Sequence, residues 1–210
     1  MTDMEKRGGG LGVETRAEGD KRTLVGYAAV FNSDTTIGDY FIERIAPTAF
    51  DKAVKGDVRA LIDHDTGRVI GRTASGTLRL AVDGRGLQVE IDVPDTADGR
   101  DLWTLVERKD ISGMSFGFRV THDEWDETGD LPHRTIHEVE LYEVSAVAFP
   151  AYDDTSLGVR SLEAARAEAD KSRDEAKRKK ENDLAAKRRI AERKAMTEQK
   201  IRGIRQDATP

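Results

Sequence analysis

The clearest alternation of large and small side chains runs along residues 111–120 (ISGMSFGFRV). In an extended strand, one face of this segment carries large apolar side chains: Met114, Phe116, Phe118 and Val120. The other face carries only Gly113, Ser115 and Gly117. Because glycine weakens a strand and often marks the close approach of another backbone, we interpret Ser115 as a candidate nucleophile in a groove suited to a peptide. The alternative is a core serine that merely tolerates small neighbours.

The same pattern predicts strands at residues 23–31, 40–45, 58–64, 78–82 and 87–93. A last long strand, or two strands joined by a bulge, is expected at 137–149. Turn residues at 83–86 favour a hairpin, and further turns are expected at 65–67 and 75–76. A short helix is predicted at 47–54, and a longer one, capped by Asp95 or Thr96, is predicted to run to about residue 109. An acidic loop is expected at 123–132.

The two ends of the chain lack this alternation. Residues 1–20 contain three consecutive glycines among charges, which predicts disorder. From residue 161 to about 202, Ala, Glu, Lys and Arg dominate without proline, which predicts a long charged helix that is either solvated or bound to a partner. We therefore expect a disordered N-terminus (1–20), a folded body (21–155) and a charged helical tail (156–210).

Composition narrows the class of protein. A chain of 210 residues is long enough for one domain of about 150 residues and an appendage. It contains no cysteine, which excludes disulfides, cysteine nucleophiles and thiolate zinc sites. Its apolar runs are much shorter than the roughly 18 residues of a membrane span, and its first ten residues do not resemble a secretory signal. We therefore expect no membrane association, and the cytosol fits this composition.

Charge is distributed unevenly along the chain. Residues 161–210 hold 15 Lys and Arg against 10 Asp and Glu, a net charge of +5. The whole chain carries −6, so residues 1–160 carry −11. Such an acidic body is a poor candidate for binding nucleic acid, because phosphate contacts depend on clustered lysine and arginine. Only the basic tail retains that option.

A serine hydroxyl needs a nearby base before it can attack a carbonyl, and a third group must orient that base. Among the four histidines (His64, His122, His133 and His137), only His64 ends a well-defined strand among small polar neighbours. Glu143 shares an apolar face of the last strand, where a carboxylate is costly to bury without a partner. Ser115, His64 and either Glu143 or His137 are therefore the candidate catalytic residues, a chemistry that requires no cofactor and no metal.

Residues 113–117 also match G-x-S-x-G, the nucleophile elbow of α/β-hydrolases. That elbow needs a strand, a sharp turn and a helix, followed by an acid and then a histidine. Here extended alternation continues after Ser115, and the chain lacks repeated strand–helix units. We interpret the match as coincidence.

Four short blocks carry a resemblance to a known family. They are residues 26–32 (GYAAVFN), 61–65 (LIDHD) with 69–71 (VIG), 111–118 (ISGMSFGF), and 141–145 (LYEVS) with 149–151 (FPA). In this order, over about residues 22–152, they resemble the tailed-phage prohead proteases. The resemblance implies an α+β fold related to herpesvirus assemblin, a mostly antiparallel β-barrel with flanking helices.

The resemblance also implies a function. Such serine endopeptidases act inside the immature capsid, in the host cytoplasm, where they remove scaffold segments from the major capsid protein and commonly cleave themselves. On the matching motif positions, Ser115 would be the nucleophile, His64 the general base and Glu143 the acidic third member. Assemblins use a second histidine in that third position, which keeps His137 as the alternative.

Other readings stay open from the sequence. The chain has no adjacent arginine pair after Glu143 like that of assemblins, so backbone amides, a water, Arg119 or Arg134 would stabilise the oxyanion. The main rival function is a non-enzymatic scaffold or capsid-assembly protein acting through the charged helix, with a generic esterase third. Cleavage-site preference, self-association, the host and removal of the tail are not determined by the sequence.

Overall fold

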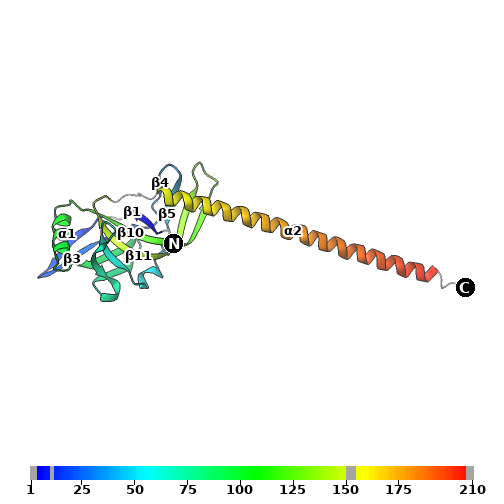
Figure 1. Cartoon of the computed structure of the whole chain (residues 1–210), viewed down its shortest axis with the longest axis horizontal. Coiled ribbons are helices and arrows are strands. Elements are labelled where there is room, and N and C mark those ends of the chain that lie inside the picture. Colours follow the sequence, from blue (N-terminus) through cyan, green and yellow to red (C-terminus); the bar gives the residue numbers. More distant parts are fainter. Residues whose placement is uncertain (1–3, 10–11, 150–154, 207–210) are drawn as a thin grey trace. The chain divides into compact units, whose positions relative to one another are not determined.

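The computed structural model describes residues 4–9, 12–149 and 155–206, which divide into the compact units Met1–Arg160 and Ser161–Pro210 (Figure 1). Among the described residues, the first unit contains these strands: β1 (Glu5–Gly8), β2 (Glu14–Glu18), β3 (Lys21–Val30), β4 (Thr35–Ile37), β5 (Phe41–Ile45), β6 (Arg59–Ile62), β7 (Asp65–Arg72), β8 (Leu78–Val82), β9 (Gly86–Asp92), β10 (Gly113–Asp126) and β11 (His133–Val147). Its helices are α1 (Ala97–Glu107) and the 3-10 turns Ala53–Lys55 and Thr73–Ser75. The long helix α2 spans Thr155–Gln206.

Strand β11 organises the larger sheet, whose main path runs β1-β10-β11-β5-β4. One edge of β11 pairs with β10 in a long antiparallel hairpin. Its other edge pairs in parallel with β5 near its start and with β6 near its end. The hairpin β6–β7 thereby comes to lie beside the second half of β11, opposite the first half of β10.

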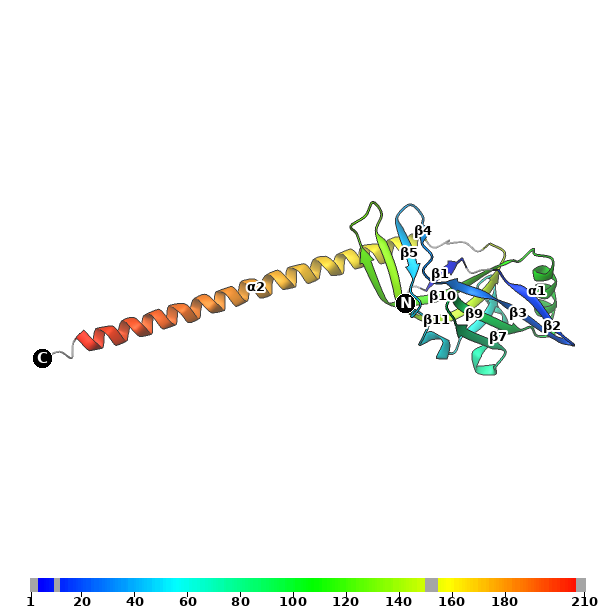
Figure 2. The same cartoon turned by 180° about the vertical axis from the view of Figure 1, so that it is seen from behind.

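The smaller sheet has the order β2-β3-β9-β8 and is antiparallel throughout (Figure 2). Its β8–β9 hairpin forms around residues 83–86, as the sequence predicts. The two sheets share one apolar core, to which β3 contributes Leu24, β9 contributes Val89 and β10 contributes Met114 and Phe116. Helix α1 begins where the Thr96 side chain accepts a hydrogen bond from the Gly99 amide at 3.1 Å.

The closed barrel with flanking helices expected from the resemblance is wrong. The described strands form two open sheets, and α1 is the only α-helix that the described residues of the first unit form in full. A barrel closes only when its end strands pair with each other at a consistent stagger. Here two separate strands, β5 and β6, pair with the same edge of β11, so the sheet branches instead of closing.

Several local predictions also need correction. Residues 5–8 and 14–18 form strands where disorder was expected. The expected acidic loop at 123–132 is shorter than predicted, since β10 continues to Asp126 and leaves residues 127–132 between the two strands. The short helix predicted at 47–54 is reduced to the 3-10 turn at Ala53–Lys55. The charged helix is present and longer than predicted.

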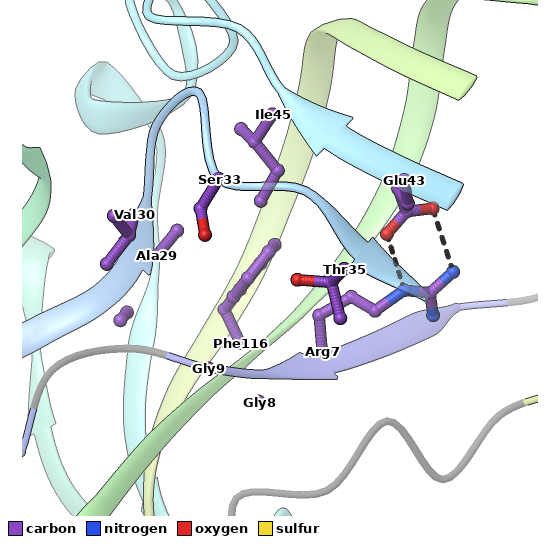
Figure 3. Close-up of a pocket in the computed structure, with 11 residues that line it drawn as sticks. Arg7, Gly8, Gly9, Ala29, Val30, Ser33, Thr35, Glu43, Ile45 and Phe116 are labelled. Atoms are coloured by element: carbon purple, nitrogen blue, oxygen red, sulfur yellow. Dashed lines mark hydrogen bonds and ion pairs between the residues drawn. The ribbon is translucent and has the colours of Figure 1, made fainter. Parts of the chain in front are cut away.

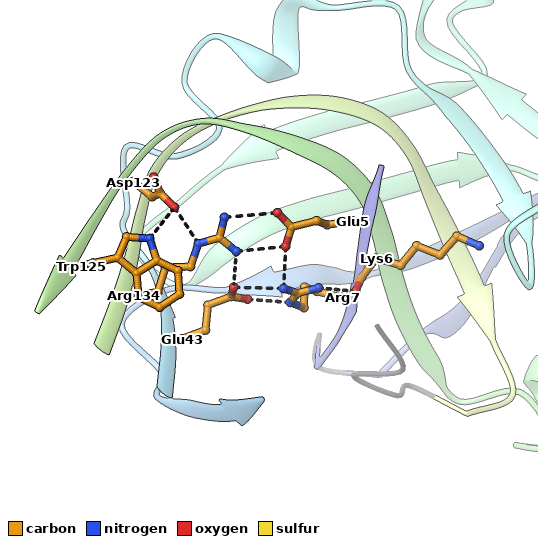
Figure 4. Close-up of polar contacts among 7 residues, drawn as sticks. All are labelled: Glu5, Lys6, Arg7, Glu43, Asp123, Trp125 and Arg134. Atoms are coloured by element: carbon orange, nitrogen blue, oxygen red, sulfur yellow. Dashed lines mark hydrogen bonds and ion pairs between the residues drawn. The ribbon is translucent and has the colours of Figure 1, made fainter. Parts of the chain in front are cut away.

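A buried cluster of charges explains why the N-terminal strand is ordered (Figure 4). Arg7 binds Glu43 on β5 through Nε at 2.7 Å and Nη2 at 3.1 Å, and its Nη2 also contacts Glu5 at 2.7 Å. Arg134 on β11 contacts both Glu5 and Glu43 at 3.0 Å, and Asp123 at 2.8 Å. The charges of β1 are therefore matched by charges from two distant strands, β5 and β11.

These contacts keep both guanidinium groups protonated despite their burial. Burial, the largest influence, lowers the pKa of Arg7, but Glu43 and Glu5 outweigh it, so that pKa is raised above its ordinary value. The pKa of Arg134 is also raised, because Glu5, Glu43 and Asp123 outweigh the effect of burial. Each cation therefore compensates buried carboxylates, which would be costly to leave unpaired.

Removal of Arg134 should consequently destabilise the first unit. We expect Arg134→Met to lower the free energy of unfolding by about 3–5 kcal/mol, the cost typical of breaking a buried ion pair on one side. Arg119→Met is the matched control, because Arg119 pairs with Glu140 on the surface and should cost less than about 1 kcal/mol. Urea unfolding followed by circular dichroism measures both, and equal losses would contradict the cluster's structural role.

Helix α2 comprises 52 residues and has few apolar positions. Three of them, Leu184, Ile190 and Met196, are more than half exposed. Within the described residues, no helix is long and apolar enough to cross a membrane.

Candidate active site

The register of the β10–β11 hairpin builds one polar face. Ser115 lies opposite Ser145, and Gly117 lies opposite Glu143, so these four residues share a side of the sheet. The intervening residues Met114, Phe116 and Val144 point to the apolar core. The register of the two strands therefore places the candidate nucleophile and the candidate acid on the same face. The sequence pattern put Glu143 in one row with Leu141, but the register shift between Gly117 and Phe118 separates the two.

Glu143 is buried, at 4% exposure, and its carboxylate is fully engaged. Its Oε1 lies 2.7 Å from Nδ1 of His64, and its Oε2 accepts a hydrogen bond from the Ser145 hydroxyl at 2.5 Å. The sequence indicated that this carboxylate needed a partner, and His64 is that partner. A carboxylate held at this position favours the tautomer with its proton on Nδ1, which leaves Nε2 free to act as a base.

His64 is positioned by a tight turn rather than by a strand end. The predicted turn at 65–67 is wrong, because β6 ends at Ile62, β7 begins at Asp65, and Asp63 and His64 form a two-residue hairpin loop between them. Both have positive φ, 47° for Asp63 and 59° for His64, as a type I′ hairpin turn requires. Non-glycine residues rarely adopt this conformation, and such strain concentrates at functional sites.

Contacts with β11 hold that turn in place. The Asp63 amide donates to the Ala146 carbonyl at 3.0 Å, and the His64 amide donates to the Ser145 hydroxyl at 3.2 Å. Ser145 thus contacts both the backbone of His64 and the carboxylate of Glu143. We interpret Ser145 as a positioning residue that fixes the imidazole relative to the sheet.

Ser115 is buried, at 2% exposure, and its hydroxyl contacts the N-terminal strand. It donates a hydrogen bond to the carbonyl oxygen of Arg7 at 2.8 Å. Its single proton is therefore directed at β1 rather than at His64. A backbone strand therefore lies directly beside the candidate nucleophile, along the edge of β10.

The alternative site residues lie elsewhere. Nε2 of His137 is 3.4 Å from Glu124, and its ring packs against His122 with centroids 5.2 Å apart. Arg119 pairs with Glu140, and Arg134 belongs to the buried charge cluster. The residue beside His64 is therefore Glu143 and not His137.

Two residues that contact the candidate site were not predicted from the sequence. Ser145 shares the parity of Glu143 along β11, which was a usable signal, but its contact with His64 depends on the β6–β7 turn. Arg7 offered no signal, because it lies in a charged, glycine-rich stretch and its partners are far away in the sequence.

Gly117 has a specific steric role that yields a prediction. A Cβ at this position would overlap Oε1 of Glu143 and lie 3.1 Å from its Cγ and Cδ. The carboxylate would then have to leave His64, whereas the rest of the strand is unaffected. We expect Gly117→Ala to fold but to lose about 10²- to 10⁴-fold in kcat, as when a triad carboxylate is disabled.

Gly84→Ala is the matched control for this prediction, because nothing lies near its added Cβ. Peptide cleavage and thermal unfolding measure both variants. Full activity of Gly117→Ala would show that the Glu143 position is not needed.

Hollows of different sizes lie among the described residues, including one of about 310 Å³ beside Arg79 and Glu90 and one of about 540 Å³ beside Arg119 and Glu140. A cavity of about 60 Å³ adjoins β1 and is lined in part by Arg7, Glu43 and Phe116 (Figure 3). Its volume is far below the roughly 300–1,000 Å³ typical of cofactor and ligand pockets. Among the described residues, no group of three acidic or histidine side chains is arranged to hold a metal ion.

Sequence comparisons show which known proteins this chain resembles. Residues 12–169 match the sequence model of a family described as caudovirus prohead serine protease. The prohead protease of Escherichia phage T5 is 31% identical over 99 residues, which cover 47% of this chain and 44% of that protein. The prohead protease of Enterobacteria phage HK97 is 28% identical over 151 residues, covering 69% of this chain and 63% of that protein.

The chain thus spans less than two thirds of the length of either relative. Among solved structures, the bacteriophage T4 capsid assembly protease gp21 aligns with 70% of this chain and 98% of its own length, at 12% identity and a TM-score of 0.49.

Proposed function

Because the chain belongs to the caudovirus prohead serine protease family, we propose that it is a serine endopeptidase that acts during prohead maturation. The observation that carries the proposal is the contact of His64 Nδ1 with Glu143 Oε1 at 2.7 Å, on the face of the sheet that presents Ser115. An imidazole oriented by a buried carboxylate is what a serine nucleophile requires.

Each residue has a distinct role in this proposal. Ser115 Oγ attacks the carbonyl carbon of the scissile bond, and Nε2 of His64 takes its proton and passes it to the leaving amine. Glu143 holds the tautomer and stabilises the charged imidazole. Ser145 positions both groups through its contacts with the His64 amide and the Glu143 carboxylate.

The proposed substrate is the scaffold segment of the major capsid protein, together with the protease itself. Cleavage would take place inside the immature capsid, within the host cytoplasm. The edge of β10 beside Ser115 supports a peptide substrate, because an extended chain can pair with this edge as β1 does. Ester hydrolysis would need no such strand edge.

We assign the charged tail (residues 156–210) to recruitment. Residues 161–210 carry +5 against −11 for the rest of the chain, and α2 exposes Leu184, Ile190 and Met196. A solvated cationic helix suits contact with an acidic scaffold. The protease domain proper is then residues 21–155 together with β1 and β2.

The test is a cleavage reaction with the capsid protein that still carries its scaffold segment. Purified protein and capsid protein are incubated together, and new termini are mapped by mass spectrometry. We expect defined new termini in the scaffold region. Their absence, while the protein still enters proheads, would favour a non-enzymatic assembly role through α2.

A further inference from the structure

The N-terminal strand pairs with β10 as a bound peptide would. β1 runs antiparallel along the edge of β10, with Gly8 opposite Ser115 and Arg7 opposite Phe116. Peptides often bind proteins by adding a strand to such an edge, where backbone hydrogen bonds give affinity and pockets for alternate side chains give specificity. β1 thus covers the edge of β10 directly beside the candidate nucleophile.

The position of β1 along this edge singles out one peptide bond. The Arg7 carbonyl oxygen accepts the hydrogen bond of Ser115 Oγ at 2.8 Å. The bond between Arg7 and Gly8 therefore lies beside the nucleophile. Gly8 has no side chain to contact Ser145 or Ser115, so the chain can pass close to the polar face.

The Arg7 side chain lies on the opposite side of the sheet, in a site that matches its charge and shape (Figure 3). It is 1% exposed and forms a two-pronged ion pair with Glu43, at 2.7 and 3.1 Å. Its guanidinium carbon lies 5.7 Å from the centre of the Phe118 ring. A planar cation stacked on an aromatic ring and paired with a carboxylate is recognition specific for arginine.

A second contact involves Glu5, two positions before Arg7. Glu5, on the same face of β1 as Arg7, is 3.0 Å from Arg134 Nη1 (Figure 4). β1 therefore brings one negative and one positive charge into the cluster, a net of zero. Another strand with glutamate and arginine at the same spacing could replace it without leaving Glu43 or Arg134 unpaired.

We propose that β1 occupies the place of the substrate strand, and that Glu43 selects an arginine immediately before the scissile bond while Arg134 favours an acidic residue two positions before that arginine. This inference rests on the proposed function. Neither Glu43 nor Arg134 touches the reacting atoms, so they are specificity determinants. β1 shields Ser115 until a substrate strand replaces it.

The covalent step is that of the proposed mechanism, now at a defined bond. A bond forms between Ser115 Oγ and the carbonyl carbon of the substrate arginine, and the Ser115 proton moves to His64. The bond from that carbon to the next nitrogen breaks, and the amine leaves with the proton from His64. Water then hydrolyses the ester, releasing an arginine carboxylate and restoring the Ser115 hydroxyl.

The first arm of the test varies the substrate and leaves the full-length protein unchanged. Three matched peptides present the sequence of residues 4–10 (MEKRGGG), with Arg, Lys or Glu at the position of Arg7. We expect kcat/KM for the Arg peptide to exceed that for the Glu peptide by at least about 100-fold, as for reversal of a buried charge pair. Lysine, which cannot form the two-pronged pair, should fall roughly tenfold below arginine.

The second arm changes the protein. In Glu43→Gln, the preference for Arg over Glu should fall below about tenfold. Glu140→Gln is the matched control, because Glu140 pairs with Arg119 on the surface. This variant should keep the full preference for the Arg peptide over the Glu peptide. If Glu43→Gln fails to fold, the substrate series on the unaltered protein still decides the question.

The outcomes separate this inference from the proposed function. Equal cleavage of the Arg and Glu peptides, or cleavage of the capsid protein without cleavage of any peptide, would overturn the inference and leave the protease intact. Failure to cleave both capsid protein and peptides would overturn both. Cleavage of the Arg peptide after arginine, without action on the capsid protein, would support the inference and refute the proposed substrate.

Discussion

Replacement of Ser115 by alanine is expected to abolish cleavage while preserving the fold. Loss of the nucleophile in a triad typically lowers kcat by about 10⁴- to 10⁶-fold. The substitution removes one hydroxyl and its hydrogen bond to the Arg7 carbonyl, which should cost no more than about 1–3 kcal/mol of stability. Peptide cleavage and thermal unfolding of the same preparation measure both effects.

Ser145→Ala provides the matched comparison, because Ser145 lies directly opposite Ser115 on the same face. It should weaken activity through its contacts with His64 and Glu143 but leave turnover measurable. A Ser115→Ala protein that still cleaves, beside an inactive Ser145→Ala protein, would mean that the nucleophile has been assigned to the wrong strand.

The second large effect is expected at His64, with a smaller one at Glu143. Asparagine is the suitable replacement for His64, because it tolerates the positive φ of 59° found there but cannot act as a base. We expect His64→Asn to be nearly as inactive as Ser115→Ala. Glu143→Gln keeps the shape but loses the charge that stabilises the imidazole, so a loss of about 10²- to 10⁴-fold with residual turnover is expected.

His137→Ala is the control for this series, since His137 contacts Glu124 and His122 at a distance from the candidate site. Its activity should stay within about twofold of the unaltered protein, as for a surface substitution away from the chemistry. An inactive His137→Ala together with an unaffected Glu143→Gln would identify His137 as the third member instead.

The sequence predicted those parts of the fold that local pattern determines. Alternation along residues 113–120 identified both faces of β10, and the turn residues at 83–86 identified the β8–β9 hairpin. Asp95 or Thr96 was predicted to cap α1, and Thr96 forms the cap. In each case the signal and the structure it specifies lie within a few residues of each other.

Long-range pairing accounts for the failures. Glu5 and Arg7 are charged residues in a glycine-rich stretch, so their local pattern favours disorder, yet Glu43 and Arg134 pair with them from distant strands. The open architecture follows from the branching of the sheet at β11, which no local pattern reveals. Both features depend on contacts that form only in the folded chain.

For the candidate site, the sequence predicted the residues but not their arrangement in space. A buried carboxylate without a partner pointed to an ionic contact for Glu143, and the structure supplies His64. The unusual backbone of the Asp63–His64 turn was not visible, because this pair is not the Asn-Gly or Asp-Gly expected of such turns. Ser145 was missed because its contacts depend on that turn.

The pairing of β1 with β10 also sets an order of events during protein synthesis. Residues 5–8 are synthesised before their partners, residues 115–118, so more than a hundred residues are added before the partner strand exists. At the usual 5–20 residues per second, this interval lasts roughly 5–20 s. Glu143 arrives later still, on β11. The nascent chain therefore cannot assemble its hydrolytic machinery until β11 has been translated, and throughout this period its N-terminal arm has no edge to pair with.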